Sequence, residues 1–524
     1  MSKIATNFWK DKWQRRNVRD PDILFQHYHK RILTQPKVAD IALVQLVLGN
    51  TGNSAAGPDG IPFLAYRSIA EQAAPVFLSV LRAMHAGGKP PNDFNAGLLI
   101  LLPKKPTGRI EDTRPLAINN TDNRIISACL RECITPSLET VLSDDQWGFR
   151  PGRSVDDNIL FFNERFYRSM EEEKIYDILL VDFKKAFDSV AHEAIFALLR
   201  RVGFPDRTVR AIQCLFHEAH CLTTIDPSNP TRINFGAGVK QGCPLSPLLF
   251  LLVIDVLLDM ISSTTPCDVK CYADDTAIGH YDITPYLPTI AKCFQVFEAH
   301  TGLGINLPKT AMVTTGGAST LRDALDNTSW HQVNIVPSYC YLGVLIGPNV
   351  DTLEVYKAPV TKLMDRLKLY ANFKLKTKYS MAKRVDIWNV WVLPILSFIF
   401  KFFILPPEFA RRIERECAAW LVEASSLKGL HLARPTELSG LATPLKDLLY
   451  TNYATLVAQS PHPHIRPPAH YNSWSMRVLV HRQIWPSSSL CNITPRSTKA
   501  IVRQPRTPVS TIIAQPPIST SPTS

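Results

Sequence analysis

The chain has 524 residues, of which 45% are hydrophobic and 20% are charged, as in ordinary globular domains. This composition excludes a collagen-like, fibrous or wholly disordered protein, and the length is enough for roughly two to four domains. The 58 basic residues exceed the 46 acidic ones and give a formal net charge of +12, which suggests a polyanionic partner.

The C-terminal end of the chain differs in composition from the rest. No acidic residue follows Asp447, seven basic residues follow position 460, and eleven of the forty prolines lie there as well. A Pro/Ser/Thr-rich segment of this kind cannot bury enough apolar surface to fold. Residues 456–524 are therefore predicted to be a largely disordered, basic tail.

Cysteine usage and hydropathy bear on the compartment. The eleven cysteines are an odd number and no secretory signal precedes them, which favours free thiols in a reducing compartment. The best candidate for a membrane span, residues 391–405, contains Pro394 and Lys401 and is shorter than the ~20 apolar residues required. We therefore expect an intracellular protein without a membrane segment.

Helical and strand-like patterns alternate irregularly along the chain. Helices are expected at 63–86, 121–142, 155–170, 191–202, 205–219, 247–262 and 286–300, and over the basic region 355–425. Strands are expected at 98–105, 175–183, 311–315 and 339–346, with hairpins over 221–240 and 269–280. This mixture favours an α+β architecture with an antiparallel sheet over a doubly wound one.

Two adjacent aspartates, Asp274 and Asp275, lie in the string CYADDTAIG between two strand-forming runs. Asp-Asp suits a tight hairpin turn, where both side chains can point to one place. Carboxylates that close repel each other, and a divalent cation such as Mg²⁺ removes the repulsion. A solvated hairpin turn is the alternative, and this string alone does not decide between the two.

A third aspartate, Asp182, ends the apolar strand in ILLVDFKKAFDSV. A carboxylate there is costly unless it is paired, caps a helix or binds a metal. Together with the hairpin pair it would hold two Mg²⁺ ions about 4 Å apart, which activate an attacking hydroxyl and stabilise leaving pyrophosphate. Asp188, six residues later, is expected to cap the following helix.

Nine strings, taken in order, resemble the reverse transcriptase domain of LINE-type (non-LTR) retrotransposons. They are GPDGIP, LLILLPKK, TRPLAINNTDNRIIS, QWGFRPGRSVDDNI, VDFKKAFDSV, QGCPLSPLLF, YADD, GLGINLPKT and YLGVLIG. The resemblance implies a right-hand polymerase fold with fingers, a palm built on an antiparallel sheet, and a helical thumb. It places an N-terminal extension at 1–50, fingers and palm at 51–350, and the thumb with a connecting segment at 351–455.

The resemblance also implies catalytic roles. Asp182, Asp274 and Asp275 match the carboxylates that bind two Mg²⁺ ions, with Mn²⁺ as an alternative ion. Lys309 matches a lysine that is a candidate proton donor to pyrophosphate. Phe187 matches the aromatic residue that excludes a ribose 2′-hydroxyl and so favours dNTPs, and it can be a core side chain at the same time.

Five further residues are implied to bind the dNTP. Gln241 and Gly242 match the loop under the incoming nucleotide, where glycine allows close backbone approach. Arg114 matches the fingers residue on the triphosphate, with Lys104 or Arg109 assisting as a cationic clamp. For the two assisting residues, ordinary solvated surface charge is an equally good interpretation.

Two features concern the primer and the sugar. Tyr341, Leu342 and Gly343 match the hairpin that supports the primer end. Ala273 occupies the variable position of the Y-x-D-D string, where RNA polymerases with this palm usually have glycine. By resemblance, Ala273 and Phe187 both favour DNA synthesis over RNA synthesis.

The expected thumb carries nine basic residues between Lys357 and Arg384, with Asp365 as the only acid. Such a segment suits the phosphate backbone of an RNA–DNA duplex, which is recognised mainly by shape and charge. The alternative is a solvated helix face. The basic residues are Lys357, Lys362, Arg366, Lys368, Lys374, Lys376, Lys378, Lys383 and Arg384.

The leading hypothesis is an RNA-directed DNA polymerase that uses an RNA template, a DNA primer, dNTPs and Mg²⁺. About fifty residues precede GPDGIP and no Cys/His-rich knuckle follows, so a truncated element without an endonuclease is expected. The rival is a catalytically inactive nucleic-acid-binding remnant, and an intron-type maturase ranks lower. A nuclear or cytoplasmic location is expected, the nucleus by resemblance only.

Overall fold

The computed structural model describes residues 2–104, 107–223, 230–348, 350–372 and 379–421, together with Leu448, Thr451, Asn452 and Thr455. The predicted tail at 456–524 lies outside the described residues, as do three of the basic thumb residues, Lys374, Lys376 and Lys378. The chain divides into two compact units, Met1–Pro359 and Val360–Ser524.

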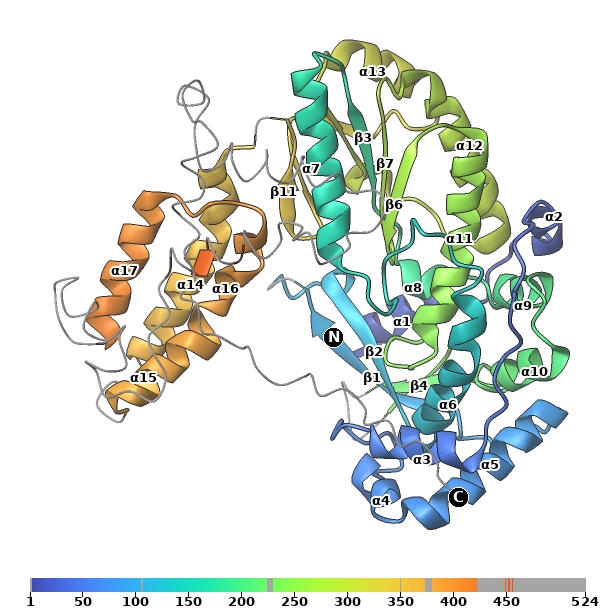
Figure 1. Cartoon of the computed structure of the whole chain (residues 1–524). Helices are drawn as coiled ribbons and strands as arrows, with labels where there is room; N and C mark the ends of the chain where they lie inside the picture. Colours follow the sequence, from blue (N-terminus) through green and yellow to red (C-terminus); the bar gives the residue numbers. More distant parts are fainter. Residues whose placement is uncertain are drawn as a thin grey trace, which may run out of the picture. The chain divides into compact units, whose positions relative to one another are not determined.

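The first unit contains a five-stranded sheet with the order β6-β7-β3-β8-β9 (Figure 1). Its strands are β3 (Asp177–Val181), β6 (Asp268–Tyr272), β7 (Asp275–His280), β8 (Ala311–Thr314) and β9 (Asn334–Val336). All neighbours pair antiparallel except β8 and β9, which are parallel. Strand β3 is central and every one of its residues is buried, which explains its continuous apolar run.

A second sheet of the same unit has the order β2-β1-β4-β5. It comprises β1 (Ala96–Pro103), β2 (Thr113–Asn119), β4 (His220–Thr223) and β5 (Arg232–Asn234). Strands β1 and β2 form a long antiparallel hairpin, and β1 pairs parallel with β4. A two-stranded hairpin, β10 (Tyr339–Tyr341) and β11 (Val344–Ile346), completes the strands of this unit that the structure describes.

Helices surround these sheets. Helix α7 contacts β6 and β11, and α11 packs against β6, α6, α9 and α12 (Figure 1). Ser154 caps α7 by accepting a hydrogen bond from the backbone N–H of Asp156. The helices of this unit are α1 (Ser2–Lys12), α2 (Pro21–Phe25), α3 (Ile41–Gly49), α4 (Phe63–Ser68), α5 (Ala70–Ala86), α6 (Thr121–Leu138), α7 (Val155–Glu171), α8 (Ala186–Ser189), α9 (His192–Arg201), α10 (Asp206–Cys214), α11 (Ser246–Thr264), α12 (Leu287–Thr301) and α13 (Ala318–Asp326).

Among the described residues, α11 alone is long and apolar enough to cross a membrane by length and composition. Of its most apolar window, 67% is buried inside the protein, and the core helix of a soluble protein meets the same criterion. The expectation that residues 391–405 are the best candidate is wrong, because that stretch forms only short helical segments.

The second unit is helical over its described residues. Helix α14 (Thr352–Asn372) leads into it, followed by α15 (Met381–Ile387), a π-helical segment (Trp388–Val392), α16 (Pro394–Ser397) and α17 (Pro407–Leu421). The side chain of Asn452 accepts from the N–H of Leu405 at 2.9 Å and donates to the carbonyl of Phe403 at 3.0 Å. This buried amide satisfies backbone groups where the helices end.

The mixed α+β class predicted from the sequence is confirmed. Most expected helices and strands are present with ends shifted by a few residues. Elements without a counterpart among the predicted ranges are the three helices before residue 50 (α1, α2 and α3), the short helix α8, helix α13 and the strands β2 and β9. The sequence around β2 contains Pro115, which weakened its strand pattern.

Candidate functional site

The turn between β6 and β7 places the two adjacent aspartates. Tyr272 pairs with Asp275, so the two turn residues are Ala273 and Asp274, and Asp275 is already in strand β7. The prediction that Asp274 and Asp275 both form the turn is therefore wrong by one residue. Ala273 takes the positive φ of +58° that a two-residue hairpin turn requires.

Asp182 lies beside this turn because β3 pairs with β7. The last register pair is Val181 with Thr276, so the next residue on each strand is Asp182 and Asp275. The Asp182 carboxylate accepts a hydrogen bond of 2.7 Å from the Asn306 side chain. Asn306 was not anticipated, although it stands in the GLGINLPKT string beside Lys309.

The charges of the three aspartates act on one another. Burial and the Asp182 charge raise the pKa of Asp274, while Lys104 and Arg114 lower it. The Asp275 side chain is exposed to solvent. The protein around its carboxylate and the charges of Asp274 and Asp182 nevertheless raise its pKa to about 6. The three carboxylates are thus close neighbours that repel in the absence of a cation.

The donor set fits a hard divalent cation. Carboxylate oxygens are the protein ligands that Mg²⁺ takes, and Asn306 already orients one of them. As placed, however, no group of three or more His, Cys, Asp or Glu side chains in the described part of the chain forms a closed metal cluster.

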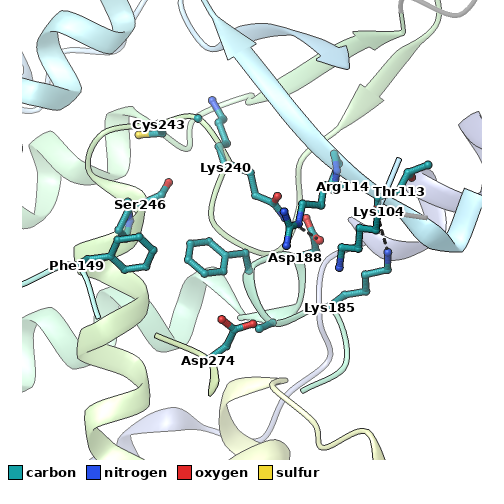
Figure 2. Close-up of a pocket in the computed structure, with 16 residues that line it drawn as sticks. Lys104, Thr113, Arg114, Phe149, Lys185, Asp188, Lys240, Cys243, Ser246 and Asp274 are labelled. Atoms are coloured by element: carbon teal, nitrogen blue, oxygen red, sulfur yellow. Dashed lines mark hydrogen bonds between the residues drawn. The ribbon is translucent and has the colours of Figure 1, made fainter. Parts of the chain in front are cut away.

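A cavity of about 440 Å³ opens beside Asp274 (Figure 2). Lys104, Arg114 and Lys185 lie together on one side of it, and Phe149 lies on the other. Its lining residues are Lys104, Thr113, Arg114, Pro115, Phe149, Lys185, Ala186, Phe187, Asp188, Lys240, Gln241, Gly242, Cys243, Ser246, Pro247 and Asp274.

Five of the six residues predicted to bind the dNTP line this cavity: Lys104, Arg114, Phe187, Gln241 and Gly242. Arg109 does not, and its guanidinium lies 3.4 Å from the Glu111 carboxylate. Its role at the triphosphate stays a prediction.

Phe187 is half-buried at the cavity wall. Its ring stacks on Phe250 with centroids 4.5 Å apart, and it meets the ring of Phe149 edge to face at 6.3 Å. Phe187 therefore combines a core contact with a place in the cavity lining, and its role in excluding a ribose 2′-hydroxyl stays a prediction.

The loop carrying Gln241 and Gly242 is tied to the second sheet. The backbone N–H of Ala117 in β2 donates to the Gln241 carbonyl at 2.8 Å. Gly242 has a φ of +116°, and a Cβ there would lie 2.7 Å from the Ala117 carbonyl oxygen. Glycine is required because the two backbones approach so closely.

Two buried or half-buried lysines line the cavity without having been anticipated. Lys185 donates to the carbonyls of Glu111 at 2.9 Å and Thr113 at 3.2 Å, and burial together with Lys104 lowers its pKa. Lys240 is 5% exposed and donates to the Asn95 carbonyl at 3.3 Å, and burial lowers its pKa. Lys185 lies inside the string VDFKKAFDSV, and Lys240 directly precedes QGCPLSPLLF. In both places a lysine by itself suggests only surface charge.

The expectation that Asp188 caps the following helix is wrong. Helix α9 has Ala191 at its N-cap, and Asp188 lies within α8 with only 2% of its surface exposed. Its carboxylate accepts from Trp13 Nε1 at 3.0 Å and from Gln241 Nε2 at 3.3 Å. Tertiary contacts rather than helix geometry hold this side chain.

The remaining predicted residues lie outside the cavity lining. Lys309 is exposed at the end of a short 3-10 helix, and its charge contributes to lowering the pKa of Lys185. Tyr341 is buried against Phe162, whereas Leu342 and Gly343 form the turn between β10 and β11 with positive φ at both positions. A primer contact in this hairpin would therefore involve the turn rather than the tyrosine ring.

Comparison with known proteins identifies the domain. Residues 102–346 match the family described as reverse transcriptase (RNA-dependent DNA polymerase). The chain is 28% identical over 308 residues to a transposon TX1 149 kDa protein of Xenopus laevis, covering 56% of the chain and 23% of that protein. It is 27% identical over 324 residues to a Pol polyprotein from the type-1 retrotransposable element R2 of Popillia japonica, covering 58% of the chain and 44% of that protein.

The chain spans less than half the length of each of these two curated relatives. Among solved structures, an apo telomerase from Candida tropicalis aligns with 48% of the chain and 53% of its own, at 11% identity and a TM-score of 0.36. That structural likeness is too weak to support an argument about this fold.

Proposed function

Since residues 102–346 form a reverse transcriptase domain related to those of non-LTR retrotransposons, we propose that the chain is an active RNA-directed DNA polymerase. It adds dNTPs to a primer 3′-hydroxyl on an RNA template. The observation that carries the proposal is the cavity in which Asp274 faces Lys104 and Arg114, with Asp182 and Asp275 beside it. A decayed domain would not be expected to keep all these groups together.

Each side of the cavity has a role in this proposal. Lys104 and Arg114 bind the triphosphate and neutralise charge that develops as pyrophosphate leaves. Phe187 closes the space beside the sugar, where a 2′-hydroxyl would collide with its ring. Gln241 and Gly242 support the nucleotide from below, and Lys309 approaches the pyrophosphate from outside the cavity lining.

Asp182, Asp274 and Asp275 are the residues that would hold divalent metal, Mg²⁺ or alternatively Mn²⁺. When bound, such ions lower the pKa of the attacking hydroxyl and stabilise the leaving group. The protein contributes oriented carboxylates, since Asn306 holds Asp182 and the turn fixes Asp274. The nuclear or cytoplasmic location stays a prediction.

Primer extension tests the proposal. Purified wild type should extend a DNA primer on an RNA template with Mg²⁺ and dNTPs, whereas Asp182→Asn and Asp274→Asn should each lose at least about a hundredfold in rate, since each removes a charge at the reacting centre. Asp326→Asn, an exposed aspartate on α13 paired with Arg322, is the matched control and should extend normally.

The outcomes separate the two hypotheses. A folded wild type that binds the template–primer duplex but never extends it would leave the non-catalytic nucleic-acid binder as the better explanation. Activity that survives both substitutions would mean that the metal ligands lie elsewhere.

A further inference from the structure

The end of helix α1 is buried against the second sheet. Trp9 and Trp13 are 0% and 1% exposed, and their rings lie 5.2 Å apart. Trp13 also packs against Phe235, with ring centroids 4.9 Å apart, in a core cluster that includes Leu99 of β1. The N-terminal segment is therefore part of the core beneath the strands that lead to the cavity.

The indole of Trp13 makes a polar contact inside this core. Its Nε1 donates to Asp188 Oδ1 at 3.0 Å, and the other oxygen of Asp188 accepts from Gln241 Nε2 at 3.3 Å. Asp188 is almost fully buried, so these donors replace the water that a carboxylate needs. One chain of hydrogen bonds thus runs from α1 to a side chain of the cavity wall.

Backbone contacts hold the same three segments together. The N–H of Gly236 donates to the Trp13 carbonyl at 2.8 Å, and the N–H of Val239 donates to the Phe187 carbonyl at 2.6 Å. A Cβ at Gly236 would lie 2.8 Å from Arg15 N, and one at Gly238 would lie 2.6 Å from the Phe187 carbonyl. The segment before Gln241 is therefore clamped between the end of α1 and the Asp188 turn.

We infer that Trp13 is a positioning residue for nucleotide binding, because its indole N–H holds Asp188 in the orientation that fixes the amide of Gln241. The inference rests on the proposed function and assigns a task to the N-terminal segment. Gln241 and Asp188 both line the cavity, whereas Trp13 lies outside its lining and acts through Asp188. Without the indole donor, Asp188 would rotate toward another donor and the Gln241 amide would lose its fixed orientation.

The chain offers a matched pair of variants. Trp13→Phe removes a bonded indole N–H, while Trp9→Phe removes an indole N–H that has no hydrogen-bond partner among the described residues. Both tryptophans are buried neighbours in one cluster, so the packing is weakened to a similar degree. Phenylalanine at position 9 also keeps an aromatic ring under Lys185, whose Nζ lies 5.1 Å from the Trp9 ring centre.

Steady-state primer extension gives the readout. Trp13→Phe should raise the KM for dNTP about three- to tenfold with kcat changed less than twofold, since the variant removes a hydrogen bond to the charged group that orients the Gln241 amide. Trp9→Phe should lower the melting temperature to a similar extent but leave KM unchanged. In a Gln241→Leu background, Trp13→Phe should add no further increase in KM, because the relay ends at that amide.

Equal KM changes in the two tryptophan variants, or an undiminished effect of Trp13→Phe in the Gln241→Leu background, would overturn the inference. If Trp13→Phe fails to fold, Asp188→Asn and Asp188→Leu replace it. Asparagine can still accept from Trp13 and donate to a rotated Gln241 amide, so its KM should rise less than that of the leucine variant. Equal increases would overturn the inference, whereas a wild type unable to extend primers would instead overturn the proposed function.

Discussion

The three aspartates of the site are held in different ways. Asp182 accepts from the Asn306 amide, and the charges of Lys104 and Arg114 oppose the rise in the pKa of Asp274. For Asp275, the protein surrounding its carboxylate and the charges of Asp274 and Asp182 all act in one direction and raise the pKa to about 6. Asp275 is therefore the residue whose charge is most costly when no cation is bound.

This difference predicts how stability depends on pH. Because the folded protein holds the Asp275 proton more tightly than the unfolded chain, this residue's contribution to stability falls as pH rises from about 4 to about 6. In divalent-free buffer at pH 7.5, Asp275→Asn should be more stable than wild type by about 0.5–1 kcal/mol, allowing for screening at this exposed site. The gain should disappear near pH 4.

Urea unfolding at the two pH values measures the effect. Addition of Mg²⁺ should stabilise the wild type more than Asp275→Asn, because the ion relieves a repulsion that the variant lacks. Identical free energies of unfolding of wild type and Asp275→Asn at pH 7.5 would show that repulsion between the carboxylates does not destabilise the metal-free protein.

At the scale of elements, the β6–β7 turn is clamped by the loop that follows α6. The buried side chain of Gln146 accepts from the backbone N–H of Gly148 at 2.9 Å and of Ala273 at 3.1 Å. Trp147 N–H donates to the Cys271 carbonyl at 2.8 Å, so the loop pairs with β6 as well. This clamp holds the QWGFRPG segment against the turn of the YADD segment.

Gly148 is where this clamp is tightest. A Cβ there would overlap the backbone nitrogen of Ala273, so Gly148→Ala must push the aspartate turn away. We expect this variant to lose about 1–3 kcal/mol of stability and at least about tenfold in primer extension, since a displacement of the turn moves Asp274. Gly317→Ala, where a Cβ would meet no atom within 4 Å, should behave as wild type in both assays. Full activity of Gly148→Ala would show that the turn tolerates the shift.

At the scale of the whole molecule, four described basic residues of the predicted thumb show two kinds of environment. Arg384 donates to the carbonyls of Trp420 and Leu421 at 3.2 Å, and Arg366 donates to the Trp391 carbonyl at 3.2 Å. These two arginines hold helices together. Lys362 and Lys383 are exposed, which makes them the better candidates for contacts with nucleic acid.

This division predicts how binding responds to salt. The affinity for an RNA–DNA duplex should fall linearly with salt on a double logarithmic plot, and replacing Lys362 and Lys383 by alanine should reduce the slope by roughly 0.7–0.9 for each phosphate that a lysine no longer neutralises. Fluorescence anisotropy over a salt series measures the slope. The control is Lys292→Ala, on α12 of the first unit. An unchanged slope in the double variant would favour the solvated-face interpretation of this segment.

The class of fold and the reverse transcriptase domain were both predictable from the chain alone. Strand β3 was evident because four consecutive apolar residues precede Asp182, and α11 because most of its residues are apolar. That Lys104, Arg114, Phe187, Gln241 and Gly242 lie in one place was implied by the family resemblance, and all five line the same cavity.

The sequence by itself determined which residue types are the candidates for the chemistry, since local patterns and the order of motifs depend only on neighbours along the chain. Only the tertiary structure decided how those residues are held. The turn lies at Ala273 and Asp274, one residue before the predicted position, because the β6–β7 register and not the Asp-Asp pair sets where it falls. Asp188 was predicted to cap a helix, but it links Trp13 to Gln241. These partners lie 175 and 53 residues away along the chain, and no local sequence pattern encodes contacts over such separations.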